Sequence, residues 1–181
     1  LSEGPFEQLI IRGATLINGN GAPPIGPVDV VVEKNIIKEV SVVGYPGVEI
    51  DSKKRPPLRA GGKEIDAHGM FLLPGFIDMH GHIGGVAQGA DWDYVFNLWL
   101  AHGITTAREP SGRGRDWALD LKKRSEKNEI IAPRIIQYTG FGQGSKYEIS
   151  TPEQARQWVR ENAKAGSDGV KSVSYTHLRA H

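Results

Sequence analysis

The chain has 181 residues with a formal net charge of +1, and 39% of its residues are hydrophobic and 24% charged. This balance is typical of a folded globular protein, and the near-neutral charge gives no electrostatic reason to expect nucleic acid or a membrane surface as a partner. The sequence contains no cysteine, which excludes disulfides and thiolate metal sites, so any bound metal must be held by nitrogen and oxygen ligands.

The first part of the chain, residues 5–68, predicts a small all-β domain. Its strands are indicated by apolar and β-branched runs at residues 9–11, 14–17, 28–33 and 36–43. Gly13 separates the first two runs, and Lys34-Asn35 separates the last two in the manner of a tight hairpin turn. A domain of this size has difficulty burying a complete core by itself.

After Gly69 the pattern alternates between strands and helices. Strands are predicted at residues 71–79, 104–107, 134–138 and 168–173, and helices at 91–102, 116–129 and 152–165. The third helix has the clearest boundaries, with Thr151 and Gln154 as a capping box and Gly166 as its stop. Strands joined by helical crossovers pair in parallel. Because a complete eight-stranded barrel needs about 250 residues, residues 69–173 predict the first half of a TIM (β/α)8 barrel, and the fold class is α/β.

The segment that indicates chemistry ends in Asp78-Met79-His80-Gly81-His82. Side chains alternate along a strand, so His80 and His82 are predicted to point the same way and to share one metal ion as neutral nitrogen donors. Asp78 has the same parity and is predicted to orient an imidazole or a metal-bound water. The alternative is that the two histidines are only polar residues in a turn.

The segment Leu72-Leu73-Pro74-Gly75-Phe76-Ile77-Asp78-Met79-His80-Gly81-His82 resembles the first-strand signature of the amidohydrolase superfamily. Residues 9–18 and the hairpin around Lys34-Asn35 resemble its small β-sandwich, and Gly103-Ile104-Thr105-Thr106 resembles its second barrel strand. The imidazolonepropionase-like and prolidase-like branch is the nearest match. The resemblance implies the composite, urease-like fold, in which a β-sandwich precedes the barrel.

The resemblance also implies a function. Such proteins carry one or two divalent ions, here expected to be zinc, and use a metal-activated water on carbon–nitrogen bonds. We therefore expect a small amide or cyclic amide as substrate, and a homo-oligomer for the full-length protein. A different class of function stays open, in which the barrel is a non-catalytic scaffold or binding protein.

Lys171 is a further ligand candidate, because the family often has a carboxylated lysine that bridges two metals on the fourth strand. An unmodified lysine, with a pKa of about 10.4, is a cation and would repel the metals. The alternative is an ordinary lysine that reaches solvent at a strand end. His68 and His102 are interpreted as structural. Arg108 and Glu109 are interpreted as an ion pair in a loop after the second strand, with the alternative that they line the mouth of the site.

The remaining parts of the family's site cannot be assigned in this sequence. The resemblance implies two more histidines and an aspartate that acts as general base, and we expect these beyond the chain end, which makes the chain by itself an inactive fragment. Residues 174–181 resemble a translated adapter and are expected to be a foreign or disordered tail. His177 and His181 within it have helical metal-pair spacing but lack the glutamate of an H-E-x-x-H motif. The chain begins at Leu1 rather than Met, so a cytoplasmic and a periplasmic location both stay open.

Overall fold

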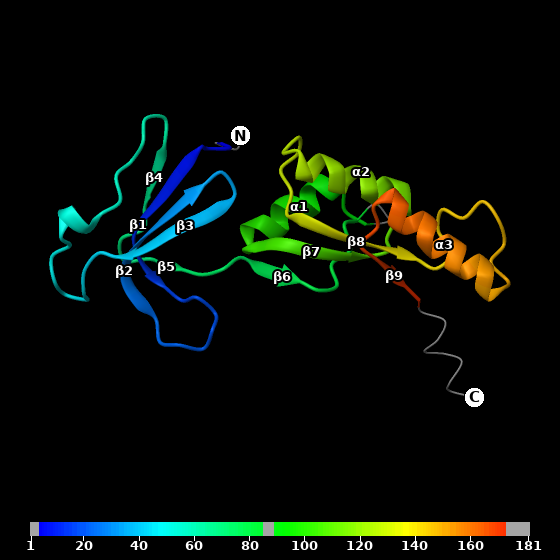
Figure 1. Cartoon of the computed structure of the whole chain (residues 1–181), viewed down its shortest axis with the longest axis horizontal. Coiled ribbons are helices and arrows are strands. Elements are labelled where there is room, and N and C mark those ends of the chain that lie inside the picture. The colour runs from blue at the N-terminus through cyan, green and yellow to red at the C-terminus, as the bar shows by residue number, and fades with distance from the viewer. Residues whose placement is uncertain (1–3, 85–88, 173–181) are drawn as a thin grey trace. The chain divides into compact units, whose positions relative to one another are not determined.

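The computed structural model describes residues 4–84 and 89–172 and divides into two compact units, Leu1–Pro74 and Gly75–His181 (Figure 1). The first unit contains one mixed sheet, and the second contains one parallel sheet with helices. The predicted tail, residues 174–181 with His177 and His181, lies outside the described residues. Among the helices that are described, none combines the length and the apolar character that a membrane crossing requires.

The sheet of the first unit has the strand order β3-β2-β1-β4, and β5 also pairs with β1. Its elements are β1 (Gln8–Leu16), β2 (Ile25–Glu33), β3 (Ile36–Val42), a 3-10 turn η1 (Ser52–Lys54), β4 (Lys63–Asp66) and β5 (Phe71–Leu72). Strands β1, β2 and β3 are antiparallel neighbours, whereas β4 and β5 run parallel to β1. The predicted turn at Lys34-Asn35 is confirmed, with Lys34 at a left-handed φ of 55°.

The two runs predicted on either side of Gly13 form one strand, β1, with an irregularity at the glycine. The register with β2 shifts between Ile11 and Ala14, and Gly13 has a φ of +74°. A residue with a side chain rarely adopts this conformation. The backbone N–H of Gly13 is turned out of the ladder and donates to Asp29 Oδ1 at 2.9 Å.

Asp29 is the buried centre of a charged cluster in this unit. Its carboxylate is fully buried and accepts hydrogen bonds from Arg12 Nη1 at 2.8 Å and from Arg55 Nε and Nη2 at 2.9 and 3.0 Å. Burial by itself would raise the pKa of Asp29, but the hydrogen bonds from Arg55, Arg12 and the Gly13 N–H together lower it below its ordinary value. The cluster therefore fixes the loop that carries Arg55 against β1 and β2.

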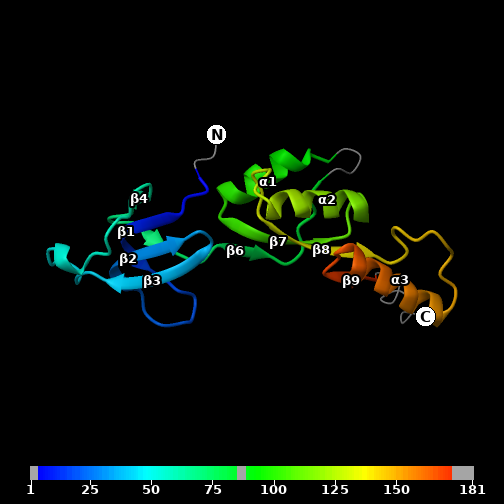
Figure 2. The ribbon, with the colours of Figure 1, turned by 45° about the horizontal axis from the view of Figure 1, so that its top comes forward.

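The second unit alternates strand and helix, as predicted. Its elements are β6 (Phe76–Asp78), α1 (Trp92–Ala101), β7 (Ile104–Pro110), α2 (Arg115–Glu126), β8 (Arg134–Gly140), α3 (Pro152–Ala165) and β9 (Gly169–Lys171). The sheet has the order β6-β7-β8-β9, and every neighbouring pair is parallel, which confirms the predicted pairing. Figure 2 shows α1 and α2 over the same face of this sheet. A core cluster of Ile83, Phe96, Leu121 and Ile135 joins the helices to the strands.

The predicted boundaries of α3 are confirmed. Thr151 Oγ1 accepts from the Gln154 N–H at 3.2 Å, and Gln154 Oε1 accepts from the Thr151 N–H at 3.0 Å. The helix ends at Gly166, whose φ is +106°. Trp158 on this helix is fully buried and donates from Nε1 to the Gln143 carbonyl at 3.0 Å. This helix is therefore anchored to the loop that follows β8.

The predicted strand at residues 71–79 is wrong in one respect, because it is two short strands that belong to different sheets. β5 pairs with β1 in the first unit, and β6 pairs with β7 in the second. Pro74 lies between them, and proline has no N–H to donate to a ladder. Since β6 ends at Asp78, His80 and His82 lie in the turn after the strand and not on it.

Candidate metal centre

His80 and His82 lie side by side in the turn that follows β6. Their ring centroids are 5.5 Å apart and the ring planes make an angle of 74°. This separation is short enough for one nitrogen of each ring to reach the same ion at a metal–nitrogen distance of about 2.1 Å. Both residues are exposed. The turn, and not strand alternation, brings the two imidazoles together.

Hydrogen bonds to the backbone define the shape of this turn. Asp78 Oδ1 accepts from the His80 N–H at 2.8 Å, and the carbonyl of Arg108 accepts from the Gly81 N–H at 3.1 Å. One residue after the pair, the Ile83 N–H donates to Glu109 Oε2 at 2.7 Å. Asp78 therefore acts on the backbone of the turn, and its predicted role in orienting an imidazole or a water stays a prediction.

Packing also holds the backbone on both sides of His82. Gly81 is buried, and a Cβ at this position would lie 2.8 Å from Trp99 Cζ2 and 2.9 Å from Cη2. Ile83 is fully buried in the core cluster under α1 and α2. The glycine between the two histidines is thus required by the indole that covers it, and the chain after His82 is anchored in the core.

Arg108 and Glu109 differ from their sequence interpretation as a loop ion pair. Both are on β7, where neighbouring side chains point to opposite faces. Arg108 Nε donates to the Met79 carbonyl at 2.6 Å, and its guanidinium carbon lies 5.0 Å from the centroid of the Tyr138 ring. Among the described contacts, no ion pair joins Arg108 to Glu109.

Glu109 belongs to this site, whereas the favoured sequence interpretation made it half of a loop ion pair. It is fully buried, and its Oε1 lies 3.4 Å from His82 Nδ1. That oxygen is enclosed and has no hydrogen-bond partner in the described part of the chain. The signal in the sequence was a charged residue that continues the Ile104–Ala107 run directly before Pro110. Because the predicted second strand ends at residue 107, the sequence alone puts Glu109 in a loop.

Lys171 is at the end of β9, the last strand in the sheet order that begins with β6. It is half-buried and pairs with Gly140 of β8. The strands are parallel, so Lys171 and the histidine turn are at the same, carboxyl-terminal edge of the sheet. No described contact links Lys171 to His80 or His82, and its role as a ligand stays a prediction.

The two histidines interpreted as structural make local contacts. His102 caps the C-terminus of α1, with Nδ1 2.8 Å from the Leu98 carbonyl oxygen. His68 donates its backbone N–H to Asp66 Oδ1 at 3.0 Å.

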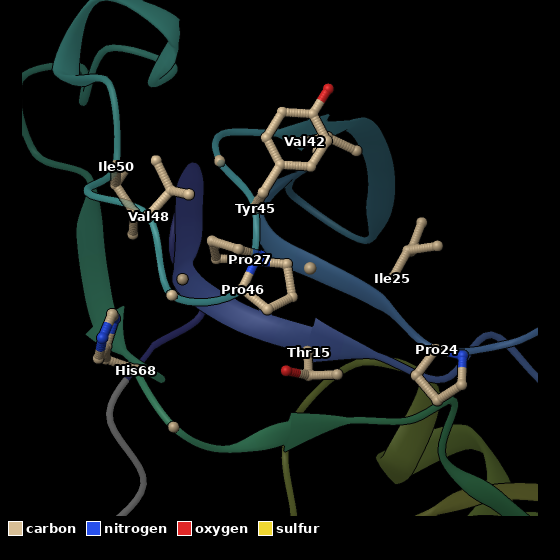
Figure 3. Close-up of a pocket in the computed structure, with 15 residues that line it drawn as sticks. Thr15, Pro24, Ile25, Pro27, Val42, Tyr45, Pro46, Val48, Ile50 and His68 are labelled. Carbon is tan, nitrogen blue, oxygen red and sulfur yellow. The ribbon is translucent and has the colours of Figure 1, made fainter.

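His68 also borders a pocket of about 660 Å³ in the first unit (Figure 3). Apolar side chains dominate its lining, among them Ile25, Val42 and Val48. Tyr45 and Pro46 line the same pocket. The described lining of this pocket contains no pair of metal-ligating groups comparable with His80 and His82.

The described residues supply two nitrogen donors for a metal and no larger set. In residues 4–84 and 89–172 no three His, Cys, Asp or Glu side chains are grouped so that they could hold one ion. Neutral imidazoles are among the preferred ligands of zinc, but catalytic zinc normally has three protein ligands. The donor chemistry of the pair fits a divalent ion, as part of a larger ligand set.

No protein-family profile matches the chain. A 5-methylthioadenosine/S-adenosylhomocysteine deaminase of Caldicellulosiruptor saccharolyticus is 30% identical over 103 residues, which are 56% of this chain and 22% of the deaminase.

Solved structures match over almost the whole chain. A Xaa-Pro dipeptidase with methionine bound in its active site has a TM-score of 0.58 and 22% identity, over 91% of this chain and 46% of the dipeptidase. Molinate hydrolase has a TM-score of 0.64 and 19% identity, over 92% of this chain and 45% of its own. The chain thus shares their fold and spans less than half of their length.

Proposed function

We propose that this chain, which is related to the amidohydrolase superfamily, supplies the first two ligands of a metal-dependent hydrolase that acts on carbon–nitrogen bonds. In this proposal His80 and His82 bind a divalent ion, and the substrate is a small amide, a cyclic amide or a dipeptide. The first unit is then part of a small β-sandwich, and the parallel sheet of the second unit is the first half of a (β/α)8 barrel.

The observation that carries the proposal is the pair of imidazoles, 5.5 Å apart, at the end of a parallel strand. In (β/α)8 barrel enzymes the chemistry is located at this end of the strands. The relatives support a hydrolase, since the names of two solved structures of the same fold are Xaa-Pro dipeptidase and molinate hydrolase. The methionine in the dipeptidase supports a substrate of amino-acid size.

A divalent ion, when bound, polarises a carbonyl and lowers the pKa of a bound water to about 7. The residues of this chain contribute binding and orientation. His80 and His82 donate neutral nitrogens, and β7 holds the turn that carries them. Lys171, at the same edge of the sheet, is proposed to join as an oxygen ligand once carboxylated, because its unmodified cation would repel the metal.

The test is the metal content, by elemental analysis, of the purified full-length protein that contains this chain, beside its His80→Ala/His82→Ala double variant, because this chain spans less than half of the length of its solved relatives. The account predicts that the unchanged protein retains zinc, manganese or a similar ion after reconstitution and that the double variant does not. No retained metal in the unchanged protein would contradict the proposal. The same samples, loaded with metal, are then assayed for release of amino acids from Xaa-Pro dipeptides and N-acyl amino acids. A protein that binds metal and hydrolyses none of these would favour the non-catalytic scaffold.

A further inference from the structure

The two carboxylate oxygens of Glu109 differ in their hydrogen bonding. Oε2 accepts from the Ile83 N–H at 2.7 Å, which fixes the position of the carboxylate relative to the backbone after His82. Oε1 is buried, has no hydrogen-bond partner in the described part of the chain, and lies 3.4 Å from His82 Nδ1. The distance is slightly beyond the usual N–H···O range of about 2.7–3.2 Å. A small rotation of the half-exposed His82 ring closes this gap.

The surroundings leave Oε1 little freedom to find another partner. Glu109 is fully buried, and a Cβ on Gly112 would lie only 3.0 Å from Oε1. A buried polar atom without a partner is costly, by about 1–3 kcal/mol in protein mutants. A side chain whose only task was to bind the Ile83 N–H would not need a second buried oxygen directed at an imidazole.

We propose that Glu109 is a positioning residue for His82: its Oε1 accepts a hydrogen bond from Nδ1–H and so leaves Nε2 as the nitrogen that faces the metal. A neutral imidazole carries one N–H, and the partner of one ring nitrogen decides which nitrogen is left for a metal. Carboxylates in this relation to a ligating histidine fix the orientation of its ring and raise its basicity. The inference rests on the proposed function for the presence of the ion, but the position of the proton can be measured without any metal.

Glu109→Gln is the discriminating variant because an amide has one acceptor and one donor end. The buried Ile83 N–H needs the acceptor, so the amide oxygen stays on Ile83 and the NH2 group turns toward His82 Nδ1. Nδ1 must then accept a hydrogen bond, and the ring proton moves to Nε2. The variant thus keeps the backbone contact and reverses the ring tautomer. Glu129→Gln is the matched control, since Glu129 is exposed and, among the contacts of the described residues, its carboxylate pairs with Lys127 at 3.8 Å.

The experiment has two readouts, on the whole chain. Long-range 1H–15N correlation of the metal-free protein at about pH 8, above the ordinary histidine pKa of about 6.5, gives the tautomer of His82, identified by its loss in His82→Ala. Zinc titration gives the affinity. We expect the Nδ1–H tautomer in the unchanged protein and the Nε2–H tautomer in Glu109→Gln. Zinc affinity is expected to fall by about 10–100-fold in this variant and to be unchanged in Glu129→Gln.

The outcomes separate this inference from the proposed function. If the unchanged protein binds zinc through His82 but its ring is in the Nε2–H form, the positioning role is overturned and the proposed function stands. An unaltered tautomer and affinity in Glu109→Gln would overturn it in the same way. If the tautomers are as expected and neither the unchanged protein nor Glu109→Gln binds zinc, the proposed function fails, while the hydrogen bond by which Glu109 orients His82 stands. Should Glu109→Gln not fold, the tautomer of the unchanged protein still decides.

Discussion

Gly81→Ala is the perturbation that most directly tests how the backbone places the two histidines. The added Cβ would lie 2.8 Å from Trp99 Cζ2, 2.9 Å from Cη2 and 3.1 Å from Asp78 Oδ2. Carbon atoms in favourable contact are about 3.5 Å apart or more, so the indole and the turn must separate by about 0.7 Å. The indole packs against Phe96 in the core, at a ring-centroid distance of 6.1 Å, and cannot retreat freely.

The expected cost is that of overpacking a filled site, about 1–3 kcal/mol in the free energy of unfolding. The turn carries both imidazoles, so zinc affinity should fall in the same variant. All four tryptophans, Trp92, Trp99, Trp117 and Trp158, belong to the second unit, so tryptophan fluorescence during denaturant unfolding reports on this unit. Gly44→Ala is the control for zinc affinity, which it should leave unchanged, because Gly44 lies in the first unit and its Cβ would make only ordinary contacts of 3.4–3.6 Å.

A second substitution makes the reasoning refutable. Trp99→Phe removes the ring atoms that the new Cβ would strike, so it should restore much of the stability and zinc affinity that Gly81→Ala loses. The two changes should couple by about 0.5–3 kcal/mol, as contacting residues do. If Gly81→Ala is neutral, or if its cost simply adds to that of Trp99→Phe, the indole does not hold the turn in the way the structure describes.

Three further predictions follow from other contacts. Asp29→Asn should lower the free energy of unfolding by about 3–5 kcal/mol at pH 7, because it breaks a buried ion cluster. The lowered pKa of Asp29 means that this difference is fully present above the unfolded pKa of about 3.9 and is lost as the pH falls through the lower folded pKa; chemical denaturation that gave a difference independent of pH would argue against it. Ile83→Ala should cost about 2–5 kcal/mol, whereas Ile131→Ala, at a residue 48% exposed, should cost far less; equal losses would contradict the burial. Thr151→Ala should cost about 0.5–2 kcal/mol and speed hydrogen exchange in the first turn of α3, and unchanged exchange would show that the cap is not formed.

Much of the fold could be predicted because local signals and tertiary structure agree in the second unit. Helix α3 is the clearest example, since a capping box and a terminal glycine fix its ends whatever it packs against. The alternation of strands and helices was enough to predict parallel pairing. The run at residues 71–79 failed because an apolar pattern does not say which sheet a strand joins, and Pro74 divides it between two.

The proposed ligands of the candidate site could be predicted from the sequence, but the residues that hold these ligands in position could not. His80 and His82 are recognised from the sequence by their spacing, although the turn and not a strand brings them together. The role of Glu109 beside His82 could not be recognised in this way, because it depends on burial and on a neighbour 27 positions earlier in the chain. Nothing in the local sequence distinguishes a carboxylate that faces a histidine from one that faces water.

The most direct test of the central claim is a zinc titration followed by histidine side-chain NMR. It is best done in a His177→Ala/His181→Ala background, so that these two histidines do not contribute. The account predicts that zinc shifts the resonances of His80 and His82 together, that binding is lost in His80→Ala and in His82→Ala, and that His102→Ala binds as before. Binding that survives the loss of either His80 or His82, or an absence of binding in the unchanged pair, would contradict the claim that these two residues form a metal site.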